Sequence, residues 1–168
     1  RIEAFDLAIL EDNKNFFPPY YASLIVRGQV LNQHPDLQEI LNLLGGQIPT
    51  QAMTQLNYRV DNNKEDVTDV ARSYLEEVLG TPMDQVNTGD EPDIIIGCKQ
   101  FTEQFILAEM FEILIENRTE LSAKVTKLSG SSLAFKALVN GSIHCYPEYT
   151  GTALLVHLED VPQDLVRS

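Results

Sequence analysis

The chain has 168 residues, 43% of them hydrophobic, which is the usual size of one domain and enough to bury a core. Its 12 basic and 25 acidic residues give a net charge of −13, which disfavours nucleic acid and anionic membranes as partners, because phosphate contacts need clustered lysine and arginine. No apolar run approaches the ~18 residues of a membrane span. The sequence opens without a signal peptide, so we expect a cut or processed start.

The first half of the chain predicts two short strands followed by helices. The run at 4–12 favours a buried strand and an acidic turn, and the run at 22–28 favours a second strand. Between them, Pro18 and Pro19 predict a rigid extended loop that presents aromatic side chains. Apolar residues at helical spacing then predict helices over 35–44, 51–60 and 65–80.

The stretch 81–93 is polar and without apolar periodicity, so it predicts a linker or a long loop. After it, strands are predicted over 93–100, 123–130 and 142–149, and helices over 103–117, 133–141 and 152–160. This βαβαβ order predicts a mostly parallel sheet with helices on its faces. In such sheets, ligands bind at the carboxyl ends of the strands, where helix N-termini also point.

Three long motifs carry a resemblance to a known family. They are "IIIGCKQFTEQFILAEM" at 94–110, "GSIHCYPEYTGTALL" at 141–155, and the segment 10–61, which contains "FFPPY" and ends in "LNYRVD". The chain resembles the substrate-binding proteins of osmoprotectant ABC transporters, the glycine betaine, choline and carnitine group. The resemblance covers nearly the whole chain except the linker.

The order of the motifs differs from that family, in which the 94–110 motif is N-terminal, the "FFPPY" motif is C-terminal and a second lobe lies between them. The resemblance therefore implies one lobe of a type II periplasmic-binding-protein-like fold, in permuted order. We expect an α/β fold with a three-layer, mostly parallel, doubly wound sheet, flavodoxin-like in appearance. The lobe would span 1–168, built from 1–80 (the family's C-terminal segment), a linker at 81–93, and 94–168 (its N-terminal segment). A junction of tandem domains, a natural permutant and an engineered lobe all fit this order.

The resemblance implies capture of a small quaternary-ammonium osmoprotectant, glycine betaine above the others, for an ABC importer. Such a cation donates no hydrogen bond and is held by the faces of aromatic rings. The family's cage positions correspond to Tyr20 and Tyr149, and the positions for a ligand carboxylate correspond to Lys99 and Thr152. The family's other cage aromatics lie in the missing lobe, so the isolated chain is expected to bind weakly or not at all.

Simpler interpretations of these four residues stay open. Tyr20 and Tyr149 could be packing aromatics, Lys99 a solvated surface lysine, and Thr152 a plain helix cap. The implied partners are the quaternary-ammonium ligand, the complementary lobe and an ABC permease, without nucleic acid, cofactor or metal. Two copies could also pair through the open ligand face as a homodimer. The parent would be bacterial and extracytoplasmic, whether periplasmic, lipid-anchored or fused to a permease.

A binding module rather than an enzyme is expected, with two alternatives. One is a permuted or engineered structural lobe that binds no ligand. The other is an enzyme built on Cys98, His144 and Cys145, of which Cys98 replaces a family serine. The first and third strands of the second half should be neighbours, so the two cysteines are expected to lie close together. They would form either a disulfide or, the favoured alternative, two small buried thiols.

Overall fold

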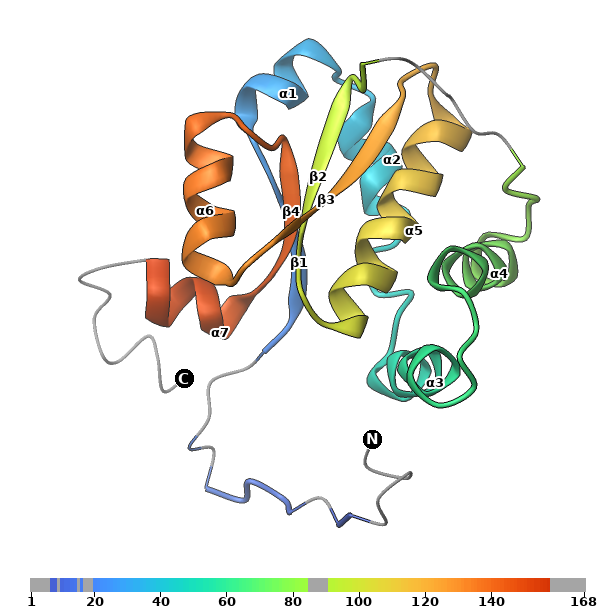
Figure 1. Cartoon of the computed structure of the whole chain (residues 1–168), viewed down its shortest axis with the longest axis vertical. Helices are drawn as coiled ribbons and strands as arrows, with labels where there is room; N and C mark the ends of the chain where they lie inside the picture. Colours follow the sequence, from blue (N-terminus) through green and yellow to red (C-terminus); the bar gives the residue numbers. More distant parts are fainter. Residues whose placement is uncertain (1–6, 9, 15, 17–19, 85–90, 158–168) are drawn as a thin grey trace.

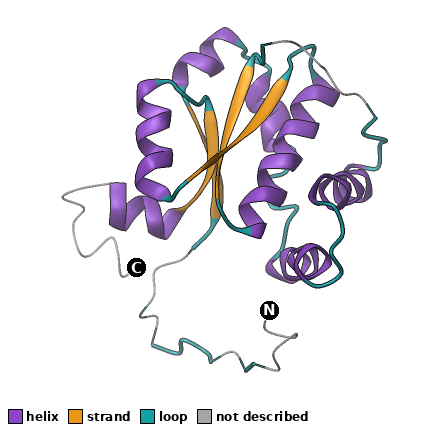
Figure 2. Ribbon diagram, viewed as in Figure 1, coloured by secondary structure: helices purple, strands orange, loops and turns teal. Residues whose placement is uncertain are grey.

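A four-stranded sheet in the order β1-β4-β2-β3 forms the middle of the molecule (Figures 1 and 2). The computed structural model describes residues 7–8, 10–14, 16, 20–84 and 91–157. The strands are β1 (Ala22–Val26), β2 (Ile94–Lys99), β3 (Ala123–Leu128) and β4 (Cys145–Tyr149). β2 is parallel to both β3 and β4, and β1 is antiparallel to β4. The mostly parallel sheet is therefore confirmed, with one antiparallel strand added from the first half of the chain.

Helices cover both faces of the sheet and give the predicted three layers (Figure 2). They are α1 (Gly28–Gln33), α2 (Leu37–Asn42), α3 (Thr50–Asp61), α4 (Val67–Leu79), α5 (Thr102–Arg118), α6 (Ser131–Asn140) and α7 (Thr150–Thr152), which continues as a π-helical turn (Ala153–His157). α6 lies on one face, whereas α5 lies on the other and is covered in turn by α3 and α4 (Figure 1). The sequence did not predict α1. No helix in the described part of the chain is long and apolar enough to cross a membrane.

The ends of α4 show how local sequence fixes a helix. Asp66 caps its start, because the carboxylate accepts the backbone N–H groups of Thr68 (2.9 Å) and Asp69 (3.3 Å). Gly80 ends it with φ 65°, a left-handed conformation that glycine adopts without a steric penalty.

Strand β2 is buried on both faces, as its continuous apolar run predicts. Ile94 and Ile96 belong to the main core with α5, whereas the opposite face meets a smaller cluster that includes Ile143 and Tyr146. Gly97 faces this cluster, and a Cβ atom there would lie 2.5 Å from the Ile143 side chain. A larger residue at this position would therefore force the end of the Ile143 side chain to move.

The strand predicted at 4–12 is not formed where the structure describes it. Leu7 and Leu10 lie in no strand and are 58% and 89% exposed, while residues 4–6 and 9 lie outside the described residues. A strand needs a neighbour for its backbone groups, and the described residues of this run pair with no strand of the sheet. The predicted Pro18–Pro19 loop and part of the linker, residues 85–90, also lie outside the described residues. The described parts of the linker, 81–84 and 91–93, contain no helix or strand, as predicted.

A row of three carboxylates on α5 lies beside β3. Glu109 accepts the Thr68 hydroxyl (2.9 Å), and Glu116 accepts the Ala123 N–H (3.2 Å). Burial, and then repulsion by Glu109 and Glu116, raises the pKa of Glu112 from 4.5 to about 7. The folded state therefore prefers the protonated form of Glu112.

Replacing Glu112 with glutamine is expected to stabilise the fold by about 1 to 3 kcal/mol at pH 8. The wild-type carboxyl favours folding below its unfolded-state pKa of 4.5, and this advantage is lost as the pH rises to about 7. The gain from Glu112→Gln should thus vanish at pH 4. Urea unfolding at both pH values measures it, with exposed Glu120→Gln as the control. A gain of the same size at both pH values would contradict the prediction.

Candidate functional site

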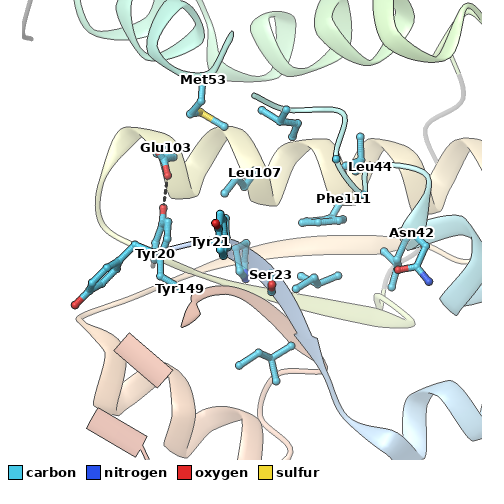
Figure 3. A pocket seen from close by; sticks show the side chains of 18 of the residues that line it. Tyr20, Tyr21, Ser23, Asn42, Leu44, Met53, Glu103, Leu107, Phe111 and Tyr149 are labelled. Atoms are coloured by element: carbon cyan, nitrogen blue, oxygen red, sulfur yellow. Dashed lines mark hydrogen bonds between the residues drawn. The ribbon is translucent and has the colours of Figure 1, made fainter. Parts of the chain in front are cut away.

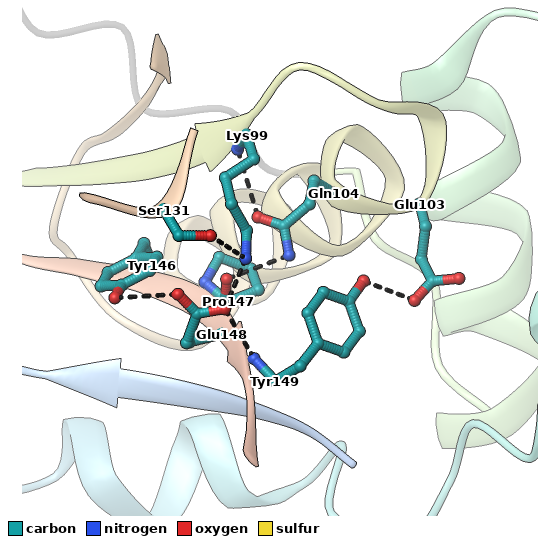
Figure 4. Close-up of polar contacts among 8 residues, drawn as sticks. All are labelled: Lys99, Glu103, Gln104, Ser131, Tyr146, Pro147, Glu148 and Tyr149. Carbon is teal, nitrogen blue, oxygen red and sulfur yellow. Dashed lines mark hydrogen bonds and ion pairs between the residues drawn. The ribbon is translucent and has the colours of Figure 1, made fainter. Parts of the chain in front are cut away.

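The candidate site lies where β2 and β4 end and α5 and α7 begin (Figure 4). Lys99 is the last residue of β2, and Tyr149 is the last residue of β4. β1 is antiparallel to β4, so its beginning lies at the same end of the sheet, with Ala22 opposite Tyr149. The sheet therefore brings the two predicted aromatic positions, Tyr20 and Tyr149, to one place.

The side chain of Tyr149 is held by a hydrogen bond from its hydroxyl and by stacking of its ring. Its hydroxyl donates to Glu103 Oε1 at 2.5 Å, and its ring stacks on Phe101 with centroids 6.2 Å apart. Glu103 Oε2 in turn accepts Asn57 Nδ2 at 3.3 Å, which ties the start of α5 to α3. Burial raises the pKa of Tyr149, and the carboxylate of Glu103 raises it further. Tyr149 therefore stays a neutral phenol in a fixed orientation.

The ring of Tyr20 rests against the first turn of α7. The carbonyl of Tyr21 accepts the Thr150 N–H (2.9 Å), and the Tyr21 N–H donates to Thr150 Oγ1 (3.1 Å). A Cβ atom on Gly151 would lie 2.5 Å from the Tyr20 ring, so this contact requires glycine. The tyrosine remains 52% exposed, so the packing leaves much of its ring in solvent.

Lys99 is not a solvated surface lysine, because it is only 5% exposed. Its ammonium group forms an ion pair with Glu148 and lies 3.5 Å from the hydroxyl of Ser131 (Figure 4). The same nitrogen lies 5.0 Å from the centroid of the Tyr149 ring. The one cation predicted to meet a ligand carboxylate is thus already paired with a carboxylate of the chain and close to an aromatic ring.

Thr152 lies in α7, half-buried, three residues after Tyr149. It does not cap the helix, because the N-cap residue of α7 is Tyr149. The plain-cap interpretation of Thr152 is therefore wrong, and its predicted contact with a ligand stays a prediction.

Sequence reasoning missed two carboxylates and an amide at this site. Glu148 is 1% exposed, and Glu103 accepts the hydroxyl of Tyr149. Gln104 joins β2 to β4, because its Oε1 accepts the Lys99 N–H and its Nε2 donates to a β4 carbonyl. One signal was present for Glu148, because a carboxylate near the end of a predicted strand needs a partner if the sheet buries it. The partner could not be found without knowing that β2 and β4 end side by side.

A cavity of about 990 Å³ adjoins the site and runs along β1 (Figure 3). Tyr20, Tyr149 and Glu103 line one part of it, and apolar residues line the rest, among them Leu44, Met53, Leu107 and Phe111. Small-molecule sites have volumes of about 300–1,000 Å³. Among the described lining residues, the predicted positions Tyr20 and Tyr149 are present and Lys99 and Thr152 are not.

The two cysteines are free thiols buried on neighbouring strands, as the favoured interpretation expects. Burial raises the pKa of Cys98 to about 11 and that of Cys145 to about 12, which disfavours the nucleophilic thiolate. His144 uses Nδ1 to accept the Ile95 N–H at 2.9 Å. Within the described ranges, no group of three or more His, Cys, Asp and Glu side chains is placed to hold a metal ion. This geometry gives the enzyme alternative no support.

Comparison with known proteins identifies the family. The substrate-binding domain of the ABC-type glycine betaine transport system matches residues 1–77 and 92–167, which is most of the chain. The chain belongs to this family. The matched stretches leave out the residues between 77 and 92, where the sequence predicts the linker.

Curated relatives are similar to parts of the chain. The carnitine transport binding protein OpuCC of Listeria monocytogenes is 40% identical over 76 residues, and the ergothioneine transport permease/ergothioneine binding protein EgtU of Helicobacter pylori is 36% identical over 76. The glycine-betaine-binding protein of Pseudomonas aeruginosa is 32% identical over 77. These alignments cover 45–46% of this chain and 25%, 14% and 25% of the three relatives, so the chain spans a quarter of their length or less. No solved structure matches the chain.

The buried thiols give a direct chemical test. Both Cys98 and Cys145 are expected to resist a thiol reagent in the native protein, because burial hides them and raises their pKa values. Without any reductant, two thiols per chain should react once urea unfolds the protein. Fewer than two thiols in unfolded, unreduced protein would show a disulfide and contradict the structure.

Proposed function

We propose that the chain binds the cation of a small quaternary-ammonium osmoprotectant, glycine betaine above the others, and delivers it to an ABC permease. The observation that carries the proposal is that Tyr20, which packs against Gly151, and Tyr149 line the same cavity. A fixed ring beside a cavity is what a cation without hydrogen-bond donors requires, and each ring contributes about 0.5–2 kcal/mol. The names of the relatives, which include carnitine and glycine betaine, support this class of ligand.

Lys99 and Thr152 complete the proposed ligand set at the polar end of the ligand. Thr152 lies on the helical turn that follows Tyr149, and Lys99 lies near the face of the same ring. The Glu103 carboxylate beside the phenol adds negative charge near the cation, which favours cations at this end of the cavity.

We further propose that the chain is one lobe of a two-lobe binder, built from 1–80 and 94–168 and joined by the linker 81–93. The two separate family matches support this division, as does the pairing of β1 with β4 at the edge of one sheet. The remaining aromatic residues would come from the complementary lobe, or from a second copy paired through the same face. A tandem-domain parent, extracytoplasmic and bacterial, fits the transport family best.

The isolated chain is expected to bind glycine betaine, choline and carnitine with dissociation constants of about 1 mM or weaker. Two rings on an open face supply only a few kcal/mol, while 1 mM already needs about 4 kcal/mol. Calorimetry measures the affinity, and light scattering measures the mass under the same conditions. A low micromolar dissociation constant for a monomer would contradict this expectation.

Substitutions in the proposed cage should weaken binding of tetramethylammonium by between about twofold and thirtyfold. Tyr20→Leu and Tyr149→Leu each remove a ring, and Gly151→Ala displaces the Tyr20 ring by steric overlap. Tyr149→Phe keeps its ring and should retain most of the affinity. Titrations followed by NMR chemical shifts measure these affinities. The control is Tyr58→Leu on α3, and a loss there as large as that of Tyr149→Leu would contradict the assignment.

A further inference from the structure

The ion pair between Lys99 and Glu148 lies next to Tyr149, which lines the cavity, and is nearly closed to solvent. The two residues are 5% and 1% exposed. We propose that Glu148 is an internal carboxylate that occupies the Lys99 ammonium group and thereby sets which ligands the site accepts. In this inference, which rests on the proposed function, Glu148 neutralises the charge of Lys99, so that Lys99 does not repel a cation and a ligand carboxylate has to compete with Glu148.

Glu148 is held firmly in this position. Its Oε1 accepts Lys99 Nζ and the Tyr149 N–H (2.8 Å), and its Oε2 accepts the Tyr146 hydroxyl at 3.2 Å (Figure 4). A buried carboxylate that accepts donors on both oxygens is costly to displace. The carboxylate therefore belongs to the resting site.

Lys99 has its ammonium group surrounded by partners of the chain itself. Glu148 balances its charge, the Ser131 hydroxyl lies at 3.5 Å, and the ring centroids of Tyr149 and Phe101 lie at 5.0 Å and 6.0 Å. A ligand carboxylate that approaches Lys99 would become the second anion on one cation. Two carboxylates in one small space repel each other, so Glu148 lowers the affinity for that ligand group.

The charge of Glu148, rather than its shape, carries this effect. Glu148→Gln preserves the size of the side chain and leaves the charge of Lys99 unbalanced. A carboxylate should then bind more tightly and a quaternary ammonium less tightly, because the site has gained one positive charge. A purely structural role for Glu148 would instead change both affinities in the same direction.

Two simple probes each carry only one of the two charged groups of glycine betaine. Sodium acetate supplies a carboxylate alone and tetramethylammonium chloride supplies a cation alone, each titrated into the full chain while backbone amide shifts of Lys99 and Tyr149 are followed. We expect Glu148→Gln to bind acetate at least about tenfold more tightly than the wild type and tetramethylammonium at least about threefold less tightly. The matched control is Glu116→Gln, another 5% exposed carboxylate on the far part of α5, which should change neither affinity.

Unchanged acetate affinity in folded Glu148→Gln would overturn the inference, and so would an equal gain in Glu116→Gln. If Glu148→Gln does not fold unaided, its circular dichroism is measured in sodium acetate and in sodium chloride at equal ionic strength. Acetate that pairs with Lys99 should recover the folded signal, and an equal response to both salts would overturn the inference. The proposed function fails separately, if tetramethylammonium leaves the wild-type resonances of Tyr20 and Tyr149 unmoved.

Discussion

The pairing of β4 with a strand on each side is the constraint on which the candidate site depends. β4 is parallel to β2 and antiparallel to β1, so the ends of β2 and β4 coincide with the beginning of β1. The last residues of two strands and the residues before a third thereby meet at one edge of the sheet. The backbone hydrogen bonds of the sheet are enough to place Lys99, Tyr149 and Tyr20 close together, without any contact between their side chains.

This pairing is also compatible with the proposed permuted order of the segments. β1 joins the sheet at an edge, so its hydrogen bonds with β4 do not depend on which segment comes first in the chain. The new order requires only that α4 be connected to β2, and the residues from 81 to 93 make that connection. Closing a loop costs free energy that grows slowly with length, about 0.6 kcal/mol for each doubling. The proposed permuted order would therefore cost little free energy.

The sequence predicts correctly the elements that are buried on nearly all sides, and it fails where burial depends on pairing with a segment far away in the sequence. The predictions of strand β2 and helix α5 are correct, because both elements are buried on nearly all sides. The run at 4–12 is equally apolar, yet Leu7 is exposed, since periodicity does not show whether a partner strand exists. The solvated-surface alternative for Lys99 is wrong for the same reason, because the sequence does not show which residues pack around the end of β2. The pairing of Lys99 with Glu148 follows from the adjacency of two strands that are far apart in sequence.

The electrostatics of the site follow from which charges the fold neutralises. The chain carries a net charge of −13, so its field attracts cations from a distance. Close to the site, Glu148 cancels the charge of Lys99, while the Glu103 carboxylate accepts the hydroxyl of Tyr149. The fold thus neutralises the charge of Lys99, which would otherwise repel a cation.

A ring that is already fixed loses little conformational entropy when a cation binds. A second protein surface that covers the site therefore does not have to orient the ring. Phe101 and Glu103 already hold Tyr149, so its orientation costs no further entropy on binding. The attraction between a ring and a cation nevertheless weakens when water surrounds the cation, and Tyr20 is half exposed. A surface that closes over this edge would therefore act mainly by excluding water from rings that are already in place.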